Sequence, residues 1–208
     1  MVNSPYIKTI ARSIKMTLPR FIAIFAIIAL GAGFFSGLKV TTPSFVYTGD
    51  KYLKEYAMFD FKMLSTIGFT DEDIEEIAKR TSCVVEGAYS ADCSAYLGDS
   101  FSADTVRFMS ITNNVNKVDL KSGRLPEKPD EIVVDAYVFP EMEPGTKLVI
   151  SDETTDKSLD MFKYREYTIV GTARTTTYLN FQRGTSNEGS GSISYFVLSL
   201  PCAFDSEY

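Results

Sequence analysis

The residue types present in this chain restrict the chemistry that it can carry out. The sequence of 208 residues contains no histidine, so the commonest general base and the commonest metal ligand are both missing. A serine or cysteine nucleophile would need a lysine or a carboxylate as its base. Paired carboxylates could hydrolyse a glycosidic bond, but 27 acidic residues single out no pair. We therefore expect no catalytic residue, no metal and no cofactor, and keep a hydrolase only as the weakest hypothesis.

Acidic residues gather in one segment, DEDIEE, at residues 71–76, which invites a calcium-binding interpretation. An EF-hand loop starting at the first of these acids needs glycine at its sixth position and glutamate at its twelfth. This sequence has Glu76 and Ser82 there. Acidic side chains are also favourable in the first turn of a helix, near the positive end of its dipole. With Thr70 as its N-cap, the segment predicts a helix over residues 70–80 rather than a metal site.

Residues 183–192, RGTSNEGSGS, resemble a phosphate-binding loop only in composition. Gly184 and Gly189 have the spacing of a Walker A motif, but Ser190 stands where the motif has lysine. We expect a flexible or partner-facing loop, and no ATPase in this chain. The arginines that could bind an anion are scattered and are predicted to form surface ion pairs: Arg107, Arg124, Arg165, Arg174 and Arg183.

Three cysteines are present, Cys83, Cys93 and Cys202. An odd number without regular spacing does not indicate a disulfide framework. Cys83 and Cys93 could meet across a hairpin, or all three cysteines could be small buried hydrophobic residues.

The elements that position these residues begin with an uncharged apolar run of 18 residues, FIAIFAIIALGAGFFSGL, at positions 21–38. At about 1.5 Å per helical residue the run spans roughly 27 Å, close to the thickness of a hydrocarbon core. Four cations and no acid precede it: Lys8, Arg12, Lys15 and Arg20. Short cytoplasmic flanks carry an excess of Lys and Arg. We therefore predict one membrane span within residues 21–45, with a cytoplasmic N-terminus and the bulk of the chain extracellular.

A cleaved signal peptide is the alternative interpretation of the same run. Small residues in its middle could pass as a cleavage site. However, the leader of 20 residues is long, and aromatic and aliphatic residues continue the run past the small ones. We expect the helix to remain uncleaved.

Small residues line one face of this predicted membrane helix. Gly33 and Gly37 form a G-x-x-x-G pair, and Ala29 and Ser36 extend the same face. Small side chains let helix backbones approach closely in a bilayer. The face is therefore predicted to pack against other helices.

The leader, residues 1–20, is predicted to form a basic amphipathic helix in the cytoplasm. Between residues 3 and 19, isoleucine and leucine recur at helical spacing, with lysine and arginine elsewhere on the wheel. Such a helix binds the inner membrane surface and favours anionic lipid. Docking on a cytoplasmic partner is the alternative.

Residues 41–208 hold 16 cations against 27 acids, a net charge of −11. This acidic balance argues against nucleic acid as a partner. Residues 41–57 predict either a continuation of the membrane helix as a stalk or a short helix after a break at Pro43. The remaining length is sufficient for one domain with a real core, which we place at residues 46–208.

Alternating apolar residues and turn signals predict a strand-rich, mixed α+β domain. We expect one helix, at residues 70–80, and polar loops at 152–160 and 183–192. The long strand at 164–179 carries a central glycine that suggests a bulge. The other predicted strands lie at residues 58–65, 82–97, 104–112, 131–135, 144–151 after a turn, and 194–200.

Four segments in order resemble the start of an FtsX-like, MacB-type ABC transporter permease. RFIAIFAIIALGAGFFSGLK resembles its first membrane helix, and FDFKMLSTIGFTDEDIEEI the opening strand and helix of the MacB-like periplasmic core domain. LKSGRLPEKPDEIVVD resembles the "GR-P-x-x-x-x-E-I-V" segment of that domain. PGTKLVI and YTIVGTARTTTYL resemble its "G-x-x-I … y-x-I-V-G" pair of strands. The motif positions are Gly123, Arg124, Pro126, Glu131, Gly145 and Gly171.

The resemblance covers essentially the whole chain and implies a non-catalytic membrane subunit. Such permeases continue into further membrane helices, so we expect this chain to be an N-terminal portion with an incomplete core domain. A separate cytoplasmic ABC ATPase would hydrolyse ATP and move the membrane helices, and the stalk would pass that movement to the extracellular domain. The remaining permease helices, or a second permease copy, would pack on the small-residue face.

The resemblance implies export or mechanotransmission, with a lipid, a peptide or a lipoprotein as the substrate. Regulation of a cell-wall hydrolase without transport is an alternative. A single-span, membrane-anchored binding or sensor domain with no ATPase is the hypothesis from a different class. Co-purification with an ATPase subunit separates these hypotheses.

Overall fold

The computed structural model describes residues 5–65 and 67–205. The first four residues of the predicted amphipathic helix, 1–4, and four residues of the predicted outer domain, 66 and 206–208, lie outside the described residues. The chain divides into two compact units, Met1–Tyr52 and Leu53–Tyr208.

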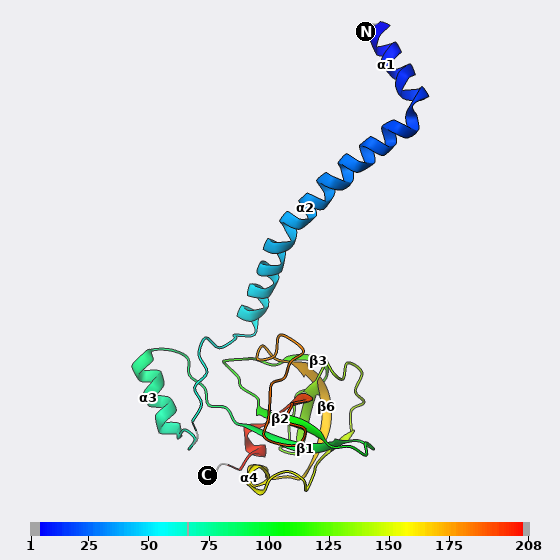
Figure 1. The fold of residues 1–208 in the computed structure, drawn as a ribbon. Helices are drawn as coiled ribbons and strands as arrows, with labels where there is room; N and C mark the ends of the chain where they lie inside the picture. Colours follow the sequence, from blue (N-terminus) through cyan, green and yellow to red (C-terminus); the bar gives the residue numbers. More distant parts are fainter. Residues whose placement is uncertain (1–4, 66, 206–208) are drawn as a thin grey trace. The chain divides into compact units, whose positions relative to one another are not determined.

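Two helices make up the first unit (Figure 1). α1 runs over Pro5–Met16 and α2 over Leu18–Glu55, so both predicted helices form. None of the described residues of α2 is buried, and the helix is long and apolar enough to cross a membrane. Of the two alternatives at Pro43, the structure has the continuous helix. The proline ring removes one backbone donor there, but α2 continues for three further turns to Glu55.

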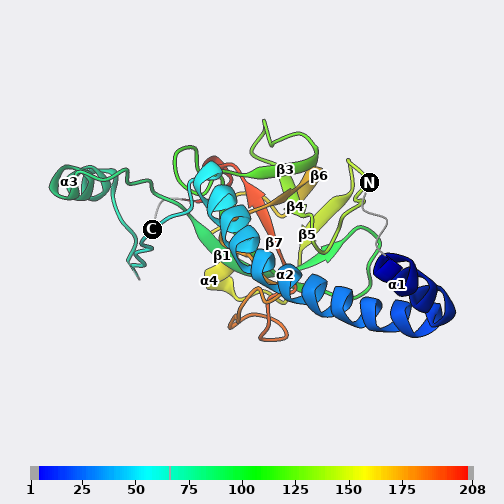
Figure 2. The ribbon, with the colours of Figure 1, turned by 90° about the horizontal axis from the view of Figure 1, so that it is seen from above.

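The second unit is built on a mixed sheet that closes into a barrel (Figures 1 and 2). The strand order is β3-β6-β4-β7-β2-β1-β5, and β5 pairs again with β6. Most neighbours are antiparallel, whereas β2 with β7 and β4 with β6 are parallel. The strands are β1 (Ser90–Leu97), β2 (Asp104–Ser110), β3 (Asp119–Gly123), β4 (Glu131–Asp135), β5 (Lys147–Ile150), β6 (Glu166–Arg174) and β7 (Tyr195–Ser199).

β6 closes the barrel because it has three partner strands. One edge pairs with β4 along its length. The other edge pairs with β5 over its first residues and with β3 over its last. The register of β6 against β4 shifts just before Gly171, which confirms the bulge predicted at this glycine.

The apolar side chains of the sheet form two clusters, one on each face. The larger cluster fills the barrel, where the ring of Phe108 packs against Tyr167 and Phe162 at centroid distances of 5.0 and 4.9 Å. The smaller cluster lies on the outer face and includes Val133, Val170, Ala173, Phe196 and Leu198.

Most predicted elements of the outer domain are confirmed. The predicted helix is α3 (Asp71–Thr81), and Thr70 caps it in a reciprocal capping box with Asp73. Strands form within the predicted ranges at residues 104–112, 131–135, 144–151, 164–179 and 194–200. One long apolar helix followed by a strand-rich α+β domain is therefore the architecture.

Three predictions are wrong. Residues 58–65 form no strand, although their side chains alternate, because no described strand pairs with them. In the predicted strand 82–97, β1 begins only at Ser90. The polar loop at 152–160 contains a short helix, α4 (Asp156–Leu159). Two elements were not predicted, the edge strand β3 and the 3₁₀ turn η1 (Pro201–Ala203).

Candidate functional site

The last turn of α2 belongs to the second unit and ends in a Schellman motif. The backbone N–H of Met58 donates to the carbonyl of Leu53 at 2.9 Å, and that of Ala57 donates to Lys54 at 3.2 Å. Ala57 takes the left-handed position, with φ of 48°, that glycine usually occupies in this motif. The helix end therefore has a defined geometry as it enters the outer domain.

Two backbone hydrogen bonds attach this helix end to residues 112–117, which we call the junction loop. The N–H of Asn116 donates to the carbonyl of Ala57 at 2.8 Å, and the N–H of Lys117 donates to that of Tyr56 at 2.9 Å. Asn116 itself has a positive φ of 50°, which asparagine tolerates better than most residues.

Side chains reinforce the same attachment. The hydroxyl of Tyr56 donates to the buried carboxylate of Asp119 at 3.0 Å. Burial and this hydrogen bond raise the pKa of Tyr56. The side-chain oxygen of Asn116 accepts from the hydroxyl of Thr176 at 2.8 Å and from the N–H of Phe59 at 3.3 Å. The junction loop thus joins the end of α2 to the residues that follow β6.

The junction loop also holds the far end of an extended excursion of the chain. Residues 58–88, which we call the arm, leave from Ala57 and return at Glu86. The carboxylate of Glu86 accepts hydrogen bonds of 2.7–3.1 Å from three successive backbone N–H groups, those of Asn113, Asn114 and Val115. Both ends of the arm are therefore attached to one loop.

Several large apolar side chains of the arm are exposed to solvent. Phe61 and Ile67 are each 90% exposed, and Met63, Leu64 and Val84 are also exposed. None of the described residues of α3 is buried, although its sequence is amphipathic. Contiguous exposed apolar residues of this kind mark interaction surfaces in soluble domains.

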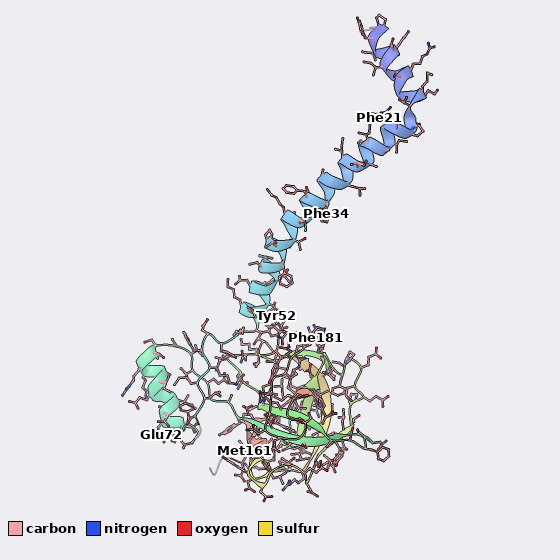
Figure 3. The ribbon with its side chains drawn as sticks, in the orientation of Figure 1. Phe21, Phe34, Tyr52, Glu72, Met161 and Phe181 are labelled. Atoms are coloured by element: carbon pink, nitrogen blue, oxygen red, sulfur yellow. The ribbon has the colours of Figure 1, made fainter. Side chains whose placement is uncertain are left out.

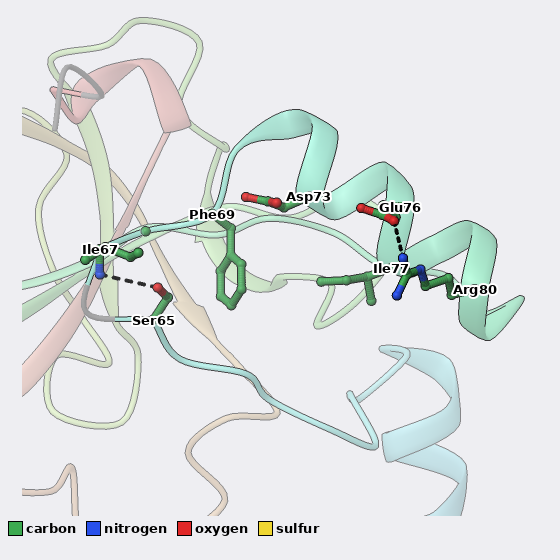
Figure 4. A pocket seen from close by; sticks show the side chains of 8 residues that line it. Ser65, Ile67, Phe69, Asp73, Glu76, Ile77 and Arg80 are labelled. Atoms are coloured by element: carbon green, nitrogen blue, oxygen red, sulfur yellow. Dashed lines mark hydrogen bonds and ion pairs between the residues drawn. The ribbon is translucent and has the colours of Figure 1, made fainter.

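A pocket of about 290 Å³ lies between α3 and the extended part of the arm (Figure 4). Its apolar lining comes from Ile67, Phe69 and Ile77, and its acidic lining from Asp73 and Glu76. The N–H and hydroxyl of Thr70 donate to the Asp73 carboxylate and lower its pKa. Glu76 is paired with Arg80. The acidic segment thus caps and pairs within its own helix, and no group of three metal-ligating side chains occurs among the described residues.

The predicted packing face of α2 is open. A Cβ added at Gly33 or at Gly37 would meet no described atom within 4 Å. Ala29 and Ser36, on the same face, are exposed. Figure 3 shows that large side chains such as Phe21 and Phe34 also project outward from the helix. Packing of this face against other helices stays a prediction.

The predicted motif residues Arg124 and Glu131 form one ion pair. Two hydrogen bonds of 2.7 Å join the guanidinium to the carboxylate of Glu131, which is buried. Glu131 also accepts from the backbone N–H of Glu127 at 2.9 Å. The hydrogen bonds from Arg124 and from two backbone N–H groups lower the pKa of Glu131 to about 2. Together with the buried ring of Pro126, the pair closes the turn between β3 and β4.

Of the three motif glycines, Gly171 belongs to β6, and Gly123 and Gly145 lie against this strand. Gly123 and Gly171 are paired in the sheet. A Cβ at Gly123 would lie 2.2 Å from the carbonyl oxygen of Val170, and a Cβ at Gly171 would lie 2.4 Å from that of Ser122. Gly145 donates its N–H to Ile169 at 2.8 Å. The structure therefore brings these motif residues together as supports of the closing strand.

The chain matches no known protein family, no curated protein and no solved structure. The resemblance to FtsX-like, MacB-type permeases therefore rests on the four sequence segments alone.

Sequence reasoning missed the role of the loop after β6. Arg183 was predicted to form a surface pair but is 4% exposed, and its guanidinium donates to the buried carboxylate of Asp135 at 2.6 Å. The guanidinium carbon also lies 5.3–5.8 Å from the ring centroids of Tyr137, Tyr178 and Phe196. The aspartate that ends the buried strand EIVVD was the available signal, because a buried carboxylate needs a cationic partner.

The Gly/Ser part of this loop, predicted to be flexible or partner-facing, is held by Glu188. Its buried carboxylate accepts from the hydroxyls of Thr155 and Ser158 at 2.5 and 2.7 Å. Burial alone would raise the pKa of Glu188, but these hydrogen bonds outweigh it, and the pKa is lowered. The loop thus serves the fold of the barrel.

All three cysteines are free, so the predicted alternative of a disulfide between Cys83 and Cys93 is wrong. Cys93 is fully buried in the barrel, which raises the pKa of its thiol. Cys83 and Cys202 are exposed, so burial of all three is wrong as well.

Proposed function

We propose that this chain is the N-terminal part of an FtsX-like, MacB-type ABC transporter permease that couples a cytoplasmic ATPase to an extracellular domain. The observation that carries the proposal is the continuity of α2. One uninterrupted helix holds the apolar span and ends at the junction loop. A helix that moves in the membrane would therefore pull directly on that loop.

The junction loop is the element that would distribute this movement. It is hydrogen-bonded to the end of α2, to both ends of the arm and to the residues that follow β6. The two positive φ values at Ala57 and Asn116 fix the turn on each side of the attachment. A shift of α2 would reach the arm and the barrel through these contacts. Rigid elements joined at a short hinge are a common means of transmitting such changes.

Partner identity is tested by purifying the tagged full chain from native membranes in mild detergent and identifying the proteins that accompany it. We expect a nucleotide-binding ATPase and further membrane helices. Gly37→Leu should reduce their recovery because it fills the small-residue face, whereas Gly31→Leu, on another face of the same helix, should not. Equal recovery of these partners with both variants would contradict the role of the small-residue face in helix packing.

Mechanical coupling is tested with a fluorophore on Cys83, which lies in the arm and is exposed. In a Cys202→Ser background, Mg-ATP added to membranes that contain the complex should change the emission of the probe. Asn116→Ala should abolish the change without loss of the ATPase from the complex. If ATP changed the probe signal as much in Asn116→Ala as in the unchanged chain, movement would not be transmitted through the junction loop.

The exposed arm favours a second candidate, a membrane-anchored binding or sensor domain without an ATPase. Its apolar side chains and pocket would then bind an extracellular peptide, lipoprotein or cell-wall enzyme. Recovery of an extracellular protein but no ATPase from native membranes, with loss of that protein in Phe61→Ser, would support this candidate over the permease.

A further inference from the structure

Two exposed apolar features of the second unit are complementary in size. One is the pocket between α3 and the extended part of the arm, which we call the arm pocket, with a volume of about 290 Å³ (Figure 4). The other is the ring of Phe181, in the loop after β6, which is 74% exposed. A cavity of about 150 Å³ already holds a benzene ring. The arm pocket therefore has room for one phenylalanine side chain.

Phe181 is exposed but held in a defined position. The guanidinium of the buried Arg183 donates to the carbonyl of Asn180. The side-chain oxygen of Asn180 accepts from the backbone N–H of Gln182 at 3.2 Å. The ring of Phe181 also packs edge-on against the ring of Tyr137, with the two centroids 4.5 Å apart. An aromatic ring fixed in this way loses little conformational freedom on binding, as is typical of the anchor residues of protein interfaces.

A cation accompanies this ring. Arg174 is exposed, and its guanidinium carbon lies 5.9 Å from the centroid of Tyr137, the ring that Phe181 contacts. Arg174 has no acidic partner within the part of the chain that the structure describes. Arg183, in the same cluster, is already paired with Asp135 at 2.6 Å. The surface around Phe181 therefore carries one uncompensated positive charge.

The arm pocket belongs to a segment of the opposite charge. The arm has seven acidic and three basic side chains, a net charge of −4. The side chains that give the pocket its character are three apolar, two acidic and one basic: Ile67, Phe69, Ile77, Asp73, Glu76 and Arg80. An aromatic ring beside a cation thus matches an apolar pocket in an acidic segment, both in hydrophobicity and in charge.

Within one chain the two features do not cover each other, because Ile67 is 90% exposed and Phe181 is 74% exposed. Both are nevertheless connected to the junction loop. Phe181 lies five residues after Thr176, whose hydroxyl donates to Asn116 of that loop, and the arm is attached to the same loop at both ends. A second chain with the same orientation would therefore offer its arm pocket on the same side of the membrane as the Phe181 of the first.

We propose that two copies of this chain associate through their outer domains, with Phe181 of each copy in the arm pocket of the other. Arg174 of each copy then faces the acidic residues of the other copy's α3. Because each copy has one pocket and one such ring, the exchange is reciprocal and closes as a symmetric pair. The inference goes beyond the proposed function, since the pair forms without an ATPase and without further membrane helices.

Cross-linking between two differently tagged full chains tests the contact. Both chains carry Cys83→Ser and Cys202→Ser, so that only the buried Cys93 remains. One chain also carries Ser65→Cys, in the lining of the arm pocket, and the other carries Gln182→Cys, beside Phe181. After co-expression and treatment of the membranes with a short bifunctional maleimide, we expect a product that carries both tags.

The position of the second cysteine provides the control. Leu125 is exposed and lies in the turn before β4, whereas Tyr137 follows the other end of that strand. Leu125→Cys in place of Gln182→Cys should therefore give no product with both tags.

Removal of the ring should abolish the contact. Phe181→Ser in the chain with Gln182→Cys should lower the yield of the two-tag product at least tenfold, as expected for an interface anchor. Because the ring is largely exposed, its removal leaves the fold intact. Phe101→Ser, at a phenylalanine that is fully exposed in the loop after β1, is the matched control and should leave the yield unchanged.

Charge reversal identifies the facing side chains. Arg174→Glu should lower the yield of the two-tag product roughly threefold to tenfold, because it brings like charges together. Glu76→Lys in the chain with Ser65→Cys should restore the yield in this background. Lys128→Glu, at an exposed lysine in the turn before β4, is the control and should change nothing.

Absence of the two-tag product from folded chains would overturn the proposal, and so would a yield that Phe181→Ser leaves unchanged. If one chain with both Ser65→Cys and Gln182→Cys cross-linked only within itself, the pocket would receive its own loop and the second copy would be excluded. None of these results bears on recovery of an ATPase, so the association of two copies and the proposed function can fail separately.

Discussion

Similar sequence patterns adopt different structures in the barrel and in the arm. EYTIVGTAR and FDFKMLS both alternate apolar and polar residues, but only the first forms a strand, β6. β6 has three partner strands, whereas residues 58–65 pair with no described strand. Alternation of apolar and polar residues therefore allows a segment to form a strand, but the strand forms only where a neighbouring strand pairs with it.

Side-chain burial also differs between the barrel and the arm. Phe108 in the barrel is fully buried, whereas Phe61 in the arm is 90% exposed. The barrel contains a buried ion pair, Asp135 with Arg183, whereas the ion pairs within α3 lie on its surface. We infer that the barrel is the stable part of the outer domain and that the arm is its interaction surface. The predictions below test this division.

The largest effect is expected for Arg183→Met in the barrel. The change leaves the carboxylate of Asp135 buried without its cation, and removing one partner of a buried ion pair costs about 3–5 kcal/mol. Urea unfolding of the full chain, followed by tyrosine fluorescence, measures the loss. Arg174→Met, at an exposed arginine over the ring of Tyr137, is the control and should cost less than about 1 kcal/mol. Equal losses in both variants would mean that the buried pair does not stabilise the barrel.

A smaller effect is expected for Gly123→Ala, at the end of β3 opposite Gly171 of β6. The residue has a positive φ of 75°, and its new methyl group would meet backbone atoms at 2.2 and 2.6 Å. We expect the free energy of unfolding to fall by roughly 3 kcal/mol. Gly145→Ala has a positive φ but no described atom within 4 Å of the added carbon, so it isolates the backbone contribution at about 1 kcal/mol. If the two variants were equally stable, the close contact with β6 would be unimportant.

The parts of this fold that sequence predicts are those set by local signals. Thr70, the acids after it and the basic last turn define α3 without reference to any other element. The central residues of β4, Ile132, Val133 and Val134, are all apolar because both faces of this strand are covered. β3 was missed because its sequence, DLKSG, is polar and mostly exposed, and only its pairing with β6 makes it a strand.

The junction could not be predicted for the same reason. Its contacts join residues that lie about 60 positions apart in the sequence, as in Ala57 with Asn116. An asparagine at positive φ is only weakly marked by its type. Four of the motif residues taken from the family resemblance, Gly123, Arg124, Glu131 and Gly171, do lie together. These contacts come from the pairing of β3 with β6 and from one ion pair, and composition alone predicts neither of them.

A pH dependence of intermediate size is expected from Glu131 in the barrel. Its pKa of about 2 in the folded chain lies below the value of about 4.3 for an unfolded chain. The pair with Arg124 therefore stabilises the fold above about pH 4.3, and this contribution is lost as the pH falls towards 2. Glu131→Gln should cost about 1–2 kcal/mol at neutral pH and remove most of that dependence.

Glu127→Gln is the matched control, because this carboxylate is exposed and only 4.0 Å from Arg124. Its unfolding free energy between pH 5 and pH 2 should follow the unchanged chain. If Glu131→Gln kept the pH dependence of the unfolding free energy, the loss of stability in acid would come from groups other than the Arg124–Glu131 pair.

The smallest effect on stability is expected for Phe61→Ala in the arm, and it is the sharpest test of the division. A residue that is 90% exposed loses almost no burial when truncated, so the free energy of unfolding should change by less than about 0.5 kcal/mol. Phe108→Ala, the same change in the barrel, should cost about 3–5 kcal/mol. Urea unfolding of both variants in the same detergent measures the difference.

The arm variant should instead alter association. If Phe61 belongs to an interaction surface, Phe61→Ala should reduce recovery of partner proteins from native membranes while the folded barrel persists. If Phe61→Ala destabilised the full chain as much as Phe108→Ala, the ring would be buried when the protein is in its detergent or membrane environment. The arm would then be part of the folded core, because a side chain can lose several kcal/mol on truncation only where it already has packed neighbours.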